Sequence, residues 1–366
     1  MNILFLDQFN SLGGAQQCLL DLLPASRENS WTPHVAIPSG GPLSARLESA
    51  GIPVHPIRCG PYTSTKKTTL DHGRFAIDTP LLAAQIWKLI RAHNIDLLYV
   101  NGPRVLPGAA IAARRRKLPL VFHCHVRLGQ ASAIRTAGWA LRYADATMIG
   151  CCKFAAEPLL RYVPPPKMHV IYNGMTDMAG SRPAGISRIG IIGRIERDKG
   201  QMEFVEAARL LLNAFPGLRF SVTGAPLFSS PGYSQSVHEA ARGLPVEFHG
   251  WKENIPEAYS SIDLLAVPSA AHDPNPRVVL EAFSARVPVV AFPSGGIPEV
   301  VTDGKNGFLT SGHSASLLAA RIGDVLRMEP AVRASVIDQA RADWAGKFTV
   351  DRFRREIAGC IAQALS

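Results

Sequence analysis

Short apolar runs alternate with helical segments along the whole chain, and this alternation constrains the fold more than any other feature. In the first half, the predicted strands cover residues 2–6, 34–38, 54–57, 97–101, 118–125, 146–149 and 168–172. Helical patterns occupy residues 18–23, 42–50, 80–93 and 135–143, together with an alanine-rich segment before Arg114. Strands that alternate with helices form parallel sheets covered on both faces, and ligands gather at the carboxyl ends of such strands.

The same alternation starts again in the second half of the chain. Strands are predicted at residues 189–192, 219–223, 246–249, 264–267 and 287–292, and helices at 202–213, from Arg277, and at 314–327, 330–345 and 350–365. A chain of 366 residues exceeds one typical core, and residues 179–186 have linker composition. The sequence therefore predicts an α/β fold of two doubly wound parallel-sheet domains, residues 1–178 and 188–345. A C-terminal helix in residues 346–366 is expected to pack back toward the first domain.

Composition is typical of an ordinary globular protein, with 47% hydrophobic and 19% charged residues. The six cysteines show no C-x-x-C spacing, which argues against a disulfide framework and against a zinc site built on thiolates. The N-terminus has no basic region followed by a long apolar run, and no apolar stretch is long enough to span a bilayer. These features predict a cytoplasmic location, and leave peripheral contact with the inner membrane face open.

Positive charge is concentrated in the first half. Residues 1–180 contain 19 Lys and Arg against 10 Asp and Glu, whereas residues 181–366 contain 20 against 19. This asymmetry predicts an anionic partner for the first half. The densest cluster, residues 114–117, could contact an anionic membrane at about 1 kcal/mol per basic residue. It could equally be a helix C-terminus whose cations suit the helix dipole. Few aromatic residues lie near the cluster, which argues against a nucleic-acid partner.

Residues 272–299, from His272 onward, carry the densest set of candidate binding groups. Asp273 and Glu281 are separated by a Pro-Asn-Pro turn and by a run that can open a helix with Pro276 at its first position. The N-terminus of a helix carries unpaired N–H groups and favours an anion such as a phosphate. Because a carboxylate beside a phosphate would repel it, both acids are interpreted as acceptors for neutral hydroxyls of a sugar or ribose. The alternative is a solvated loop acid followed by an exposed helix glutamate.

A charged turn follows the predicted strand 189–192. Arg194 and Lys199 bracket this turn, where two cations would neutralise a diphosphate. The alternative is a solvated turn in which Arg194 pairs with Glu196 or Asp198.

Two features of the first half lie at predicted strand ends. The glycine pair Gly13 and Gly14, between a strand and a helix, lets backbone approach a ligand closely, although a simple tight turn is the alternative. His125 ends the strand 118–125 and faces the same side as His123. The two histidines could bind a metal, but no acidic or thiol partner accompanies them at ligand spacing. His125 is therefore the candidate for a polar role in a cleft, and a packed imidazole is the alternative.

Together these segments make the chain resemble glycosyltransferase family 4, a group of retaining enzymes with the GT-B fold, over essentially its whole length. The resemblance rests on segments in the family's order, at residues 13–15, 118–125, 170–174, 193–200, 268–269, 273–282, 295–299 and 303–307. It implies two Rossmann-like domains that face one another across a cleft. The first would hold the acceptor, and the second the nucleotide-sugar donor.

The resemblance also implies roles for individual residues. Arg194 and Lys199 would grip the donor diphosphate, and Glu281 would bind the ribose. Asp273 would face hydroxyls of the sugar, and His125 would contact the transferred sugar. The other implied substrate-binding positions are Gly13, Gly14, Asn173, Gly224, Asn275, Pro276, Arg277 and Val278. Family members are similar in needing no divalent metal, and the sequence has no D-x-D triplet to hold one.

Two positions depart from the family pattern. Asp273 stands where the family usually has glutamate, which makes the choice of donor sugar uncertain. Gln16 stands where glutamate often follows the glycine pair, which leaves the cleft less acidic.

The function implied is that of a retaining glycosyltransferase without metal or cofactor. It would move a sugar from a nucleoside-diphosphate sugar to an acceptor hydroxyl by attack on the face from which the diphosphate leaves. The implied partners are a nucleotide-sugar donor and a carbohydrate or lipid-linked acceptor. A catalytically silent nucleotide-sugar binding protein and a GT-B sugar-nucleotide isomerase are the alternatives.

Overall fold

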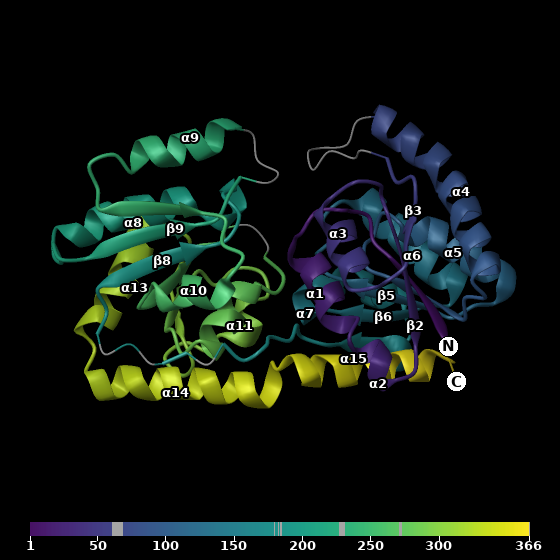
Figure 1. Cartoon of the computed structure of the whole chain (residues 1–366). Helices are drawn as coiled ribbons and strands as arrows, with labels where there is room; N and C mark the ends of the chain where they lie inside the picture. Colours follow the sequence, from purple (N-terminus) through teal and green to yellow (C-terminus); the bar gives the residue numbers. More distant parts are fainter. Residues whose placement is uncertain are drawn as a thin grey trace. The chain divides into compact units, whose positions relative to one another are not determined.

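The computed structural model describes residues 1–60, 69–178, 180–181, 183, 185–226, 231–270 and 273–365. His272 and, in the predicted linker, Ala179, Arg182 and Ala184 lie outside the described residues. The chain divides into two units, Met1–Gly174 with Asp351–Ser366, and Met175–Val350. Each unit has a parallel sheet of its own with helices on both faces, so the predicted α/β class is confirmed (Figure 1).

The first unit is built on a seven-stranded sheet in the order β3-β2-β1-β4-β5-β6-β7. Its strands are β1 (Asn2–Leu6), β2 (Thr32–Ile37), β3 (Val54–Pro56), β4 (Leu97–Val100), β5 (Leu120–Cys124), β6 (Thr147–Gly150) and β7 (Met168–Val170). The strand order reverses direction at β1, which pairs in parallel with both β2 and β4. This reversal makes the β1–β4 boundary the topological switch point of the first unit.

Helices cover both faces of this sheet. They are α1 (Gly14–Leu22), α2 (Ala25–Glu28), α3 (Pro42–Ser49), α4 (Thr69–Ala92), α5 (Leu106–Arg116), α6 (Ala131–Ala144), α7 (Lys153–Ala156) and α15 (Val350–Leu365), with 3₁₀ turns η1 (Glu157–Tyr162) and η2 (Pro165–Lys167). Apolar residues of α4, α5 and α6 form one core with the sheet, and those of α1, α3 and α15 form another.

The C-terminal helix α15 belongs to the core of the first unit. Phe353, Ile357 and Ile361 recur every four residues and are all buried in the cluster that contains Ile3 and Phe5 of β1. Full burial of each such side chain contributes roughly 1.5–3 kcal/mol. The last sixteen residues therefore anchor to the strands at the start of the chain.

Helix α4 corrects one sequence prediction. The helix expected at 80–93 begins at Thr69, and Pro80 lies inside it instead of at its start. Proline removes one helical N–H, which leaves the carbonyl of Ala76 without its usual partner. Ala76 is exposed, so water can replace the missing donor, and the helix continues through the proline.

The second unit contains a six-stranded parallel sheet in the order β10-β9-β8-β11-β12-β13. Its strands are β8 (Arg188–Ile192), β9 (Arg219–Thr223), β10 (Val246–Gly250), β11 (Leu264–Val267), β12 (Val289–Ala291) and β13 (Phe308–Leu309). Its helices are α8 (Gln201–Leu212), α9 (Pro231–Ala240), α10 (Ile255–Ser260), α11 (Arg277–Ser284), α12 (Ile297–Val300), α13 (Ala315–Arg327) and α14 (Pro330–Lys347), with the 3₁₀ turn η3 (Arg197–Lys199). Helices α8, α9 and α13 share one core with the sheet, and α11 packs against α14. The switch point lies between β8 and β11.

The basic cluster at residues 114–117 lies at the C-terminus of α5, where Lys117 adopts a left-handed conformation. All four side chains are exposed, and the guanidinium groups of Arg115 and Arg116 each lie 5.9 Å from the ring centre of Trp87. The basic cluster therefore lies at a helix C-terminus, as expected for cations that suit the helix dipole. Its contact with a membrane stays a prediction. Among the described helices, none has the length and apolar character needed to cross a bilayer.

Candidate active site

Each unit places polar side chains where its strand order reverses. In doubly wound sheets, ligands bind outside the carboxyl ends of the two strands that flank such a point. In the first unit, Asp7 follows β1 and Asn101 follows β4. In the second unit, the loops after β8 and β11 carry Lys199 and Asp273.

A buried carboxylate organises the site of the first unit. Asn101 Nδ2 donates to Asp7 Oδ2 at 2.6 Å, and Gln16 Nε2 donates to both Asp7 oxygens at 2.9 and 3.0 Å. Asp7 is fully buried, and burial raises its pKa to about 6, although the hydrogen bonds from Asn101, Phe9 and Gln16 act in the opposite direction. An amide at position 16 can donate to Asp7, whereas a carboxylate there would repel it. Gln16 is thus part of the support for Asp7, a role that its departure from the family pattern had not suggested.

His125 is held in place by the same network. Its Nε2 lies 2.8 Å from Asn101 Oδ1. Because Asn101 Nδ2 donates to Asp7 and to the carbonyl of Ala15 at 3.1 Å, the Asn101 oxygen must accept, and the proton is assigned to His125 Nε2. The hydrogen bonds that link Asp7 to Asn101 and Asn101 to His125 therefore fix both the ring orientation and the tautomer of the histidine.

The neighbouring His123 has a different character. Its ring centre lies 3.8 Å from that of His125, and its Nδ1 lies 2.6 Å from the hydroxyl of Tyr99. Burial, with a smaller contribution from His125, lowers the pKa of His123 well below its usual value. His123 is therefore a packed neutral imidazole that supports the ring of His125.

The glycine pair and Asn173 occupy separate positions in the first unit. Gly13 caps α1, and a Cβ on it would lie 2.9 Å from Gln16 Oε1, so glycine leaves room for the Gln16 side chain. Gly14 is the first residue of α1. Asn173 is buried after β7, and Arg352 Nη2 donates to its carbonyl at 3.2 Å. This contact ties the strand end to α15.

An ion pair crosses the switch point of the second unit. Lys199 ends the turn η3 after β8, and Asp273 lies between β11 and α11. Lys199 Nζ is 2.5 Å from Asp273 Oδ2, and the two side chains are 24% and 10% exposed. The structure thus brings together two predicted site residues that are 74 positions apart.

The loop after β12 fixes the backbone of Asp273. Gly295 has a φ of +60°, and a Cβ there would lie 2.1 Å from the carbonyl oxygen of Asp273. The N–H of Gly296 donates to that same oxygen at 2.9 Å. Glycine is required because the two loops touch through their backbones.

Arg194 lies in a tightly held loop. Its Nη2 is 3.2 Å from Glu196 Oε2, so the pairing considered as the alternative is present. Gln201 is fully buried, donates to the carbonyl of Arg194 at 2.7 Å, and accepts from the N–H of Glu196 at 3.2 Å. Burial raises the pKa of Glu196, and the charge of Arg194 opposes that shift. Arg194 remains 30% exposed beside the switch point.

Gly224 has a packing function that the sequence did not reveal. Its φ is +147°, and a Cβ would lie 1.8 Å from the carbonyl oxygen of Gly193. The end of β9 therefore packs directly against the loop that carries Arg194. The substrate-binding role of Gly224 stays a prediction.

Helix α11 presents its N-terminus on the same side of the sheet. Pro276 is the capping residue and not the first helical residue, so the helix starts one position later than predicted, at Arg277. The N–H of Val279 bonds to the carbonyl of Pro276, and Arg277 and Val278 are the first two residues of the helix, where the N–H groups point out of its N-terminus. Asn275, just before the cap, is buried.

Glu281 is buried on α11, so the alternative of an exposed helix glutamate is wrong. The hydroxyl of Tyr259 donates to Glu281 Oε2 at 2.9 Å, and Arg277 Nε lies 3.7 Å from Oε1. Burial raises the pKa of Tyr259 well above its usual value, so the phenol keeps its proton and donates. A buried carboxylate with a fixed orientation is suited to accept hydrogen bonds from hydroxyls.

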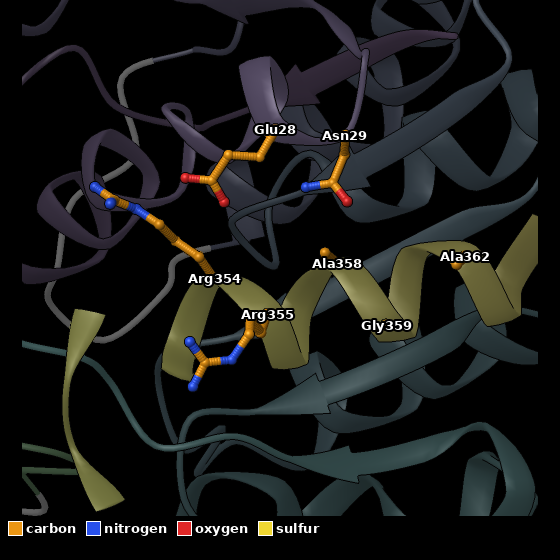
Figure 2. Close-up of a pocket in the computed structure, with 7 residues that line it drawn as sticks. All are labelled: Glu28, Asn29, Arg354, Arg355, Ala358, Gly359 and Ala362. Atoms are coloured by element: carbon orange, nitrogen blue, oxygen red, sulfur yellow. The ribbon is translucent and has the colours of Figure 1, made fainter. Parts of the chain in front are cut away.

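Cavities also lie away from these residues. One of about 310 Å³ in the first unit lies between the end of α2 and α15 (Figure 2). Figure 2 shows its lining residues, Glu28, Asn29, Arg354, Arg355, Ala358, Gly359 and Ala362. Another, of about 440 Å³ in the second unit, includes Arg188 and Asp263 in its lining. Neither is lined by a predicted site residue.

Comparisons with known proteins cover both units. The family model described as "Glycosyl transferase 4-like domain" matches residues 13–174, and that described as "Glycosyl transferases group 1" matches residues 186–328. A D-inositol 3-phosphate glycosyltransferase of Streptomyces scabiei is 28% identical over 324 residues, which are 78% of this chain and 72% of the relative. One of Mycobacterium marinum is 31% identical over 159 residues, which are 41% of this chain and only 34% of that relative.

A solved structure shows the same fold along the whole chain. Anabaena Alr3699/HepE in complex with UDP-glucose matches with a TM-score of 0.83 and 27% sequence identity. The match covers 99% of this chain and 100% of that chain.

Proposed function

Because the chain belongs to the glycosyltransferase family that these two models describe, we propose that it is a retaining enzyme that transfers a sugar from a nucleoside-diphosphate sugar to an acceptor hydroxyl without a metal ion. The observation that carries this proposal is the Lys199–Asp273 pair at the switch point of the second unit, beside the loop that leads into α11. A cation and a fixed carboxylate there suit a ligand that combines a diphosphate with hydroxyl groups.

The donor proposed first is a UDP-sugar. Anabaena HepE, which has been solved with UDP-glucose, is similar over essentially the whole chain. Glu281 would accept from the ribose hydroxyls, since it is buried, oriented by Tyr259 and close to Arg277.

The diphosphate would be held by protein groups. Lys199 would exchange the carboxylate of Asp273 for a phosphate oxygen, Arg194 would bind a second one, and the N–H groups of Arg277 and Val278 would add helix-terminal donors. Cleavage of the bond to the anomeric carbon builds negative charge on the leaving diphosphate, so fixed cations and amide dipoles lower the barrier. Released from Lys199, Asp273 would accept from sugar hydroxyls, and His125 keeps its proposed contact with the transferred sugar.

The proposed chemistry is a same-face substitution. The bond between the anomeric carbon and the phosphate oxygen breaks, and the acceptor oxygen forms a bond to that carbon from the same side. The acceptor hydroxyl gives its proton to the departing phosphate oxygen. Atoms and charge balance without a metal or a protein nucleophile.

The acceptor is proposed to be anionic. The first unit contains 22 Lys and Arg against 11 Asp and Glu, whereas the second contains 17 against 18. The relatives from Streptomyces and Mycobacterium are named for a phosphorylated acceptor, D-inositol 3-phosphate. A phosphorylated polyol or a lipid-linked phosphate would match the charge of the first unit.

The test is a donor and acceptor panel with free nucleotide and glycoside as readouts. UDP-, GDP- and ADP-sugars are incubated with inositol phosphates, neutral glycans and lipid-linked acceptors, with and without EDTA. We expect UDP release and a product with the donor's anomeric configuration, unchanged by EDTA. Donor binding without release would favour the silent binding protein, and donor conversion without an acceptor would favour the isomerase. Inversion, or loss of turnover with EDTA, would overturn the proposed mechanism.

A further inference from the structure

Three histidines converge in the first unit on a surface separate from the candidate active site. His34 lies on β2, His55 on β3, and His93 directly after α4. One ring nitrogen from each lies within 4.8 Å of the others, and His34 Nδ1 is 3.1 Å from His55 Nε2. Ring centres are separated by 5.3, 4.7 and 4.5 Å. His34 is buried and the other two are half-buried.

The sheet register explains why these side chains meet. His34 is paired with Leu4, and His55 is paired with Ala36, two residues beyond His34. Paired residues of parallel strands face the same side, and so do residues two apart on one strand. Both histidines therefore face the layer of α4, because Leu4 and Ala36 belong to the core that α4 covers. His93 is brought to the same side by the end of α4.

The segment carrying His93 is fixed from β1. Asn2 Nδ2 donates to the carbonyl of His93 at 2.8 Å and to that of Asn94 at 3.2 Å. The N–H of Asn2 bonds to Asp96 Oδ2 at 2.8 Å. These contacts hold the connection between α4 and β4 at the start of β1, opposite the carboxyl ends that carry Asp7 and Asn101.

The spacing of the ring nitrogens suits a tetrahedral metal ion. With Zn–N bonds of about 2.0–2.1 Å, tetrahedral ligand nitrogens lie about 3.3 Å apart. The His34 Nδ1–His55 Nε2 separation, a hydrogen bond of 3.1 Å that a metal would replace, is already close to that value, and the third nitrogen lies within 4.8 Å of the other two.

We propose that His34, His55 and His93 form a binding site for a divalent transition metal, with water in the fourth position. Imidazole ligands suit zinc, copper and nickel, and zinc is the probe chosen for the test. Bound metal would join β2, β3 and the α4–β4 connection. It would act on the stability of the first unit and not on donor cleavage, because the connection that carries His93 lies at the start of β1, opposite the carboxyl ends of β1 and β4 at the switch point.

The proposal is tested by equilibrium dialysis of the full chain, prepared without a histidine tag, against zinc. We expect one bound zinc per chain. His55→Gln and His93→Gln should each weaken binding by at least the roughly 10- to 100-fold that even outer-sphere partners are worth. His313→Gln, which alters an exposed histidine of the second unit, serves as the matched control and should bind zinc as the wild type does.

Two further measurements separate metal binding from folding defects. Zinc should raise the melting temperature of the wild type but not of His55→Gln/His93→Gln, whose far-ultraviolet circular dichroism should match that of the wild type. Cobalt should give the visible absorption of a four-coordinate site in the wild type, and this absorption should be lost in the double variant. A wild type that binds no zinc, or a folded double variant that retains the zinc, would overturn the proposal. Nucleotide release from the donor tests the transferase separately, so the two failures are distinguishable.

Discussion

At the scale of single residues, the buried carboxyl of Asp7 should couple the stability of the first unit to pH. Its pKa is raised by burial from 3.8 to about 6 in the folded chain. A raised carboxyl pKa means that the folded state binds the proton more tightly. The resulting stabilisation is fully present below about pH 3.8 and is lost as pH rises through about 6. Between pH 5 and 7.5, the free energy of unfolding of the wild type should fall by about 1.4 kcal/mol because Asp7 loses its proton.

Asp7→Asn removes this titration. Urea unfolding at pH 5 and at pH 7.5 measures the free energy of unfolding of both proteins. Between these two pH values, it should fall by about 1.4 kcal/mol more for the wild type than for Asp7→Asn. Glu48→Gln replaces an exposed carboxylate on α3 and should retain the pH dependence of the wild type. If the wild type and Asp7→Asn showed parallel pH dependences, Asp7 would not titrate in this range.

Asn101 is a positioning residue that acts through His125. Asn101→Ala and His125→Ala should each lower kcat/KM on the order of 10- to 100-fold, because the histidine loses its orientation in one variant and its ring in the other. The kcat/KM of the double variant should be little lower than that of either single variant, because both substitutions remove the same hydrogen bond between Asn101 and His125. Gln17→Ala, which removes an amide of α1 that bonds to Asp21, should leave kcat/KM unchanged. Additive losses in the double variant would show that Asn101 acts independently of His125.

At the scale of elements, two loops and one helix share the proposed grip on the donor. Lys199→Ala removes the cation between the β8 and β11 loops and should lower kcat/KM on the order of 10²- to 10³-fold. Glu281→Ala should weaken binding of a UDP-sugar in calorimetric titration, because the ribose loses its acceptor. Both variants should keep the wild-type circular dichroism spectrum. Lys305→Ala, an exposed lysine in the turn before β13, is the matched control and should retain full activity. Near-normal turnover in Lys199→Ala would mean that the diphosphate binds elsewhere.

The elements show what a sequence can predict. The spacing of hydrophobic residues predicted β9, β11 and α15 with the same bounds that the structure has, because this spacing is regular within each of these segments. Helix α4 was too short in the prediction because Pro80 was interpreted as a helix start, whereas an exposed turn tolerates proline inside the helix. Whether a proline can lie inside a helix depends on whether water can reach the carbonyl that has lost its N–H partner. The local sequence pattern does not show this exposure.

The site residues also divide into those that a local sequence pattern could have predicted and those that it could not. Asp7 and Asn101 follow apolar strands, so the strand-end reasoning that selected His125 could have selected them too. Gln201 and Tyr259 give no such signal. Gln201 bonds to backbone groups five and seven residues before it, and Tyr259 bonds to a side chain 22 residues after it, and neither spacing belongs to a motif. The three histidines of the proposed metal site are likewise separated by 21 residues and more, without any motif spacing.

At the scale of the whole molecule, charge separates the two units. The first has an excess of 11 positive charges, whereas the second is nearly neutral. Binding of an anionic acceptor should therefore weaken as salt rises, while binding of UDP, which relies on a few local cations and amides, should change less. Steady-state KM for an anionic acceptor, compared at 50 and 300 mM salt with KM for the donor, checks this. Equal salt responses, or no response for the acceptor, would contradict the assignment of the anionic ligand to the first unit.

Nucleotide binding should also stabilise one unit selectively. Proposed contacts with the diphosphate and ribose all come from residues of Met175–Val350, so UDP should raise the melting temperature of that unit. A ligand at 100 times its Kd adds about 2.7 kcal/mol to the free energy of unfolding. For a unit of this size each kcal/mol shifts the melting temperature by about 2–4 °C, which predicts a rise of about 5–10 °C. Scanning calorimetry resolves the transitions of the two units, and Lys199→Ala should show a much smaller rise. UDP that instead stabilised the unit containing Asp7 and His125 would place the nucleotide on the other sheet, and the roles proposed for Arg194, Lys199 and Glu281 would then be wrong.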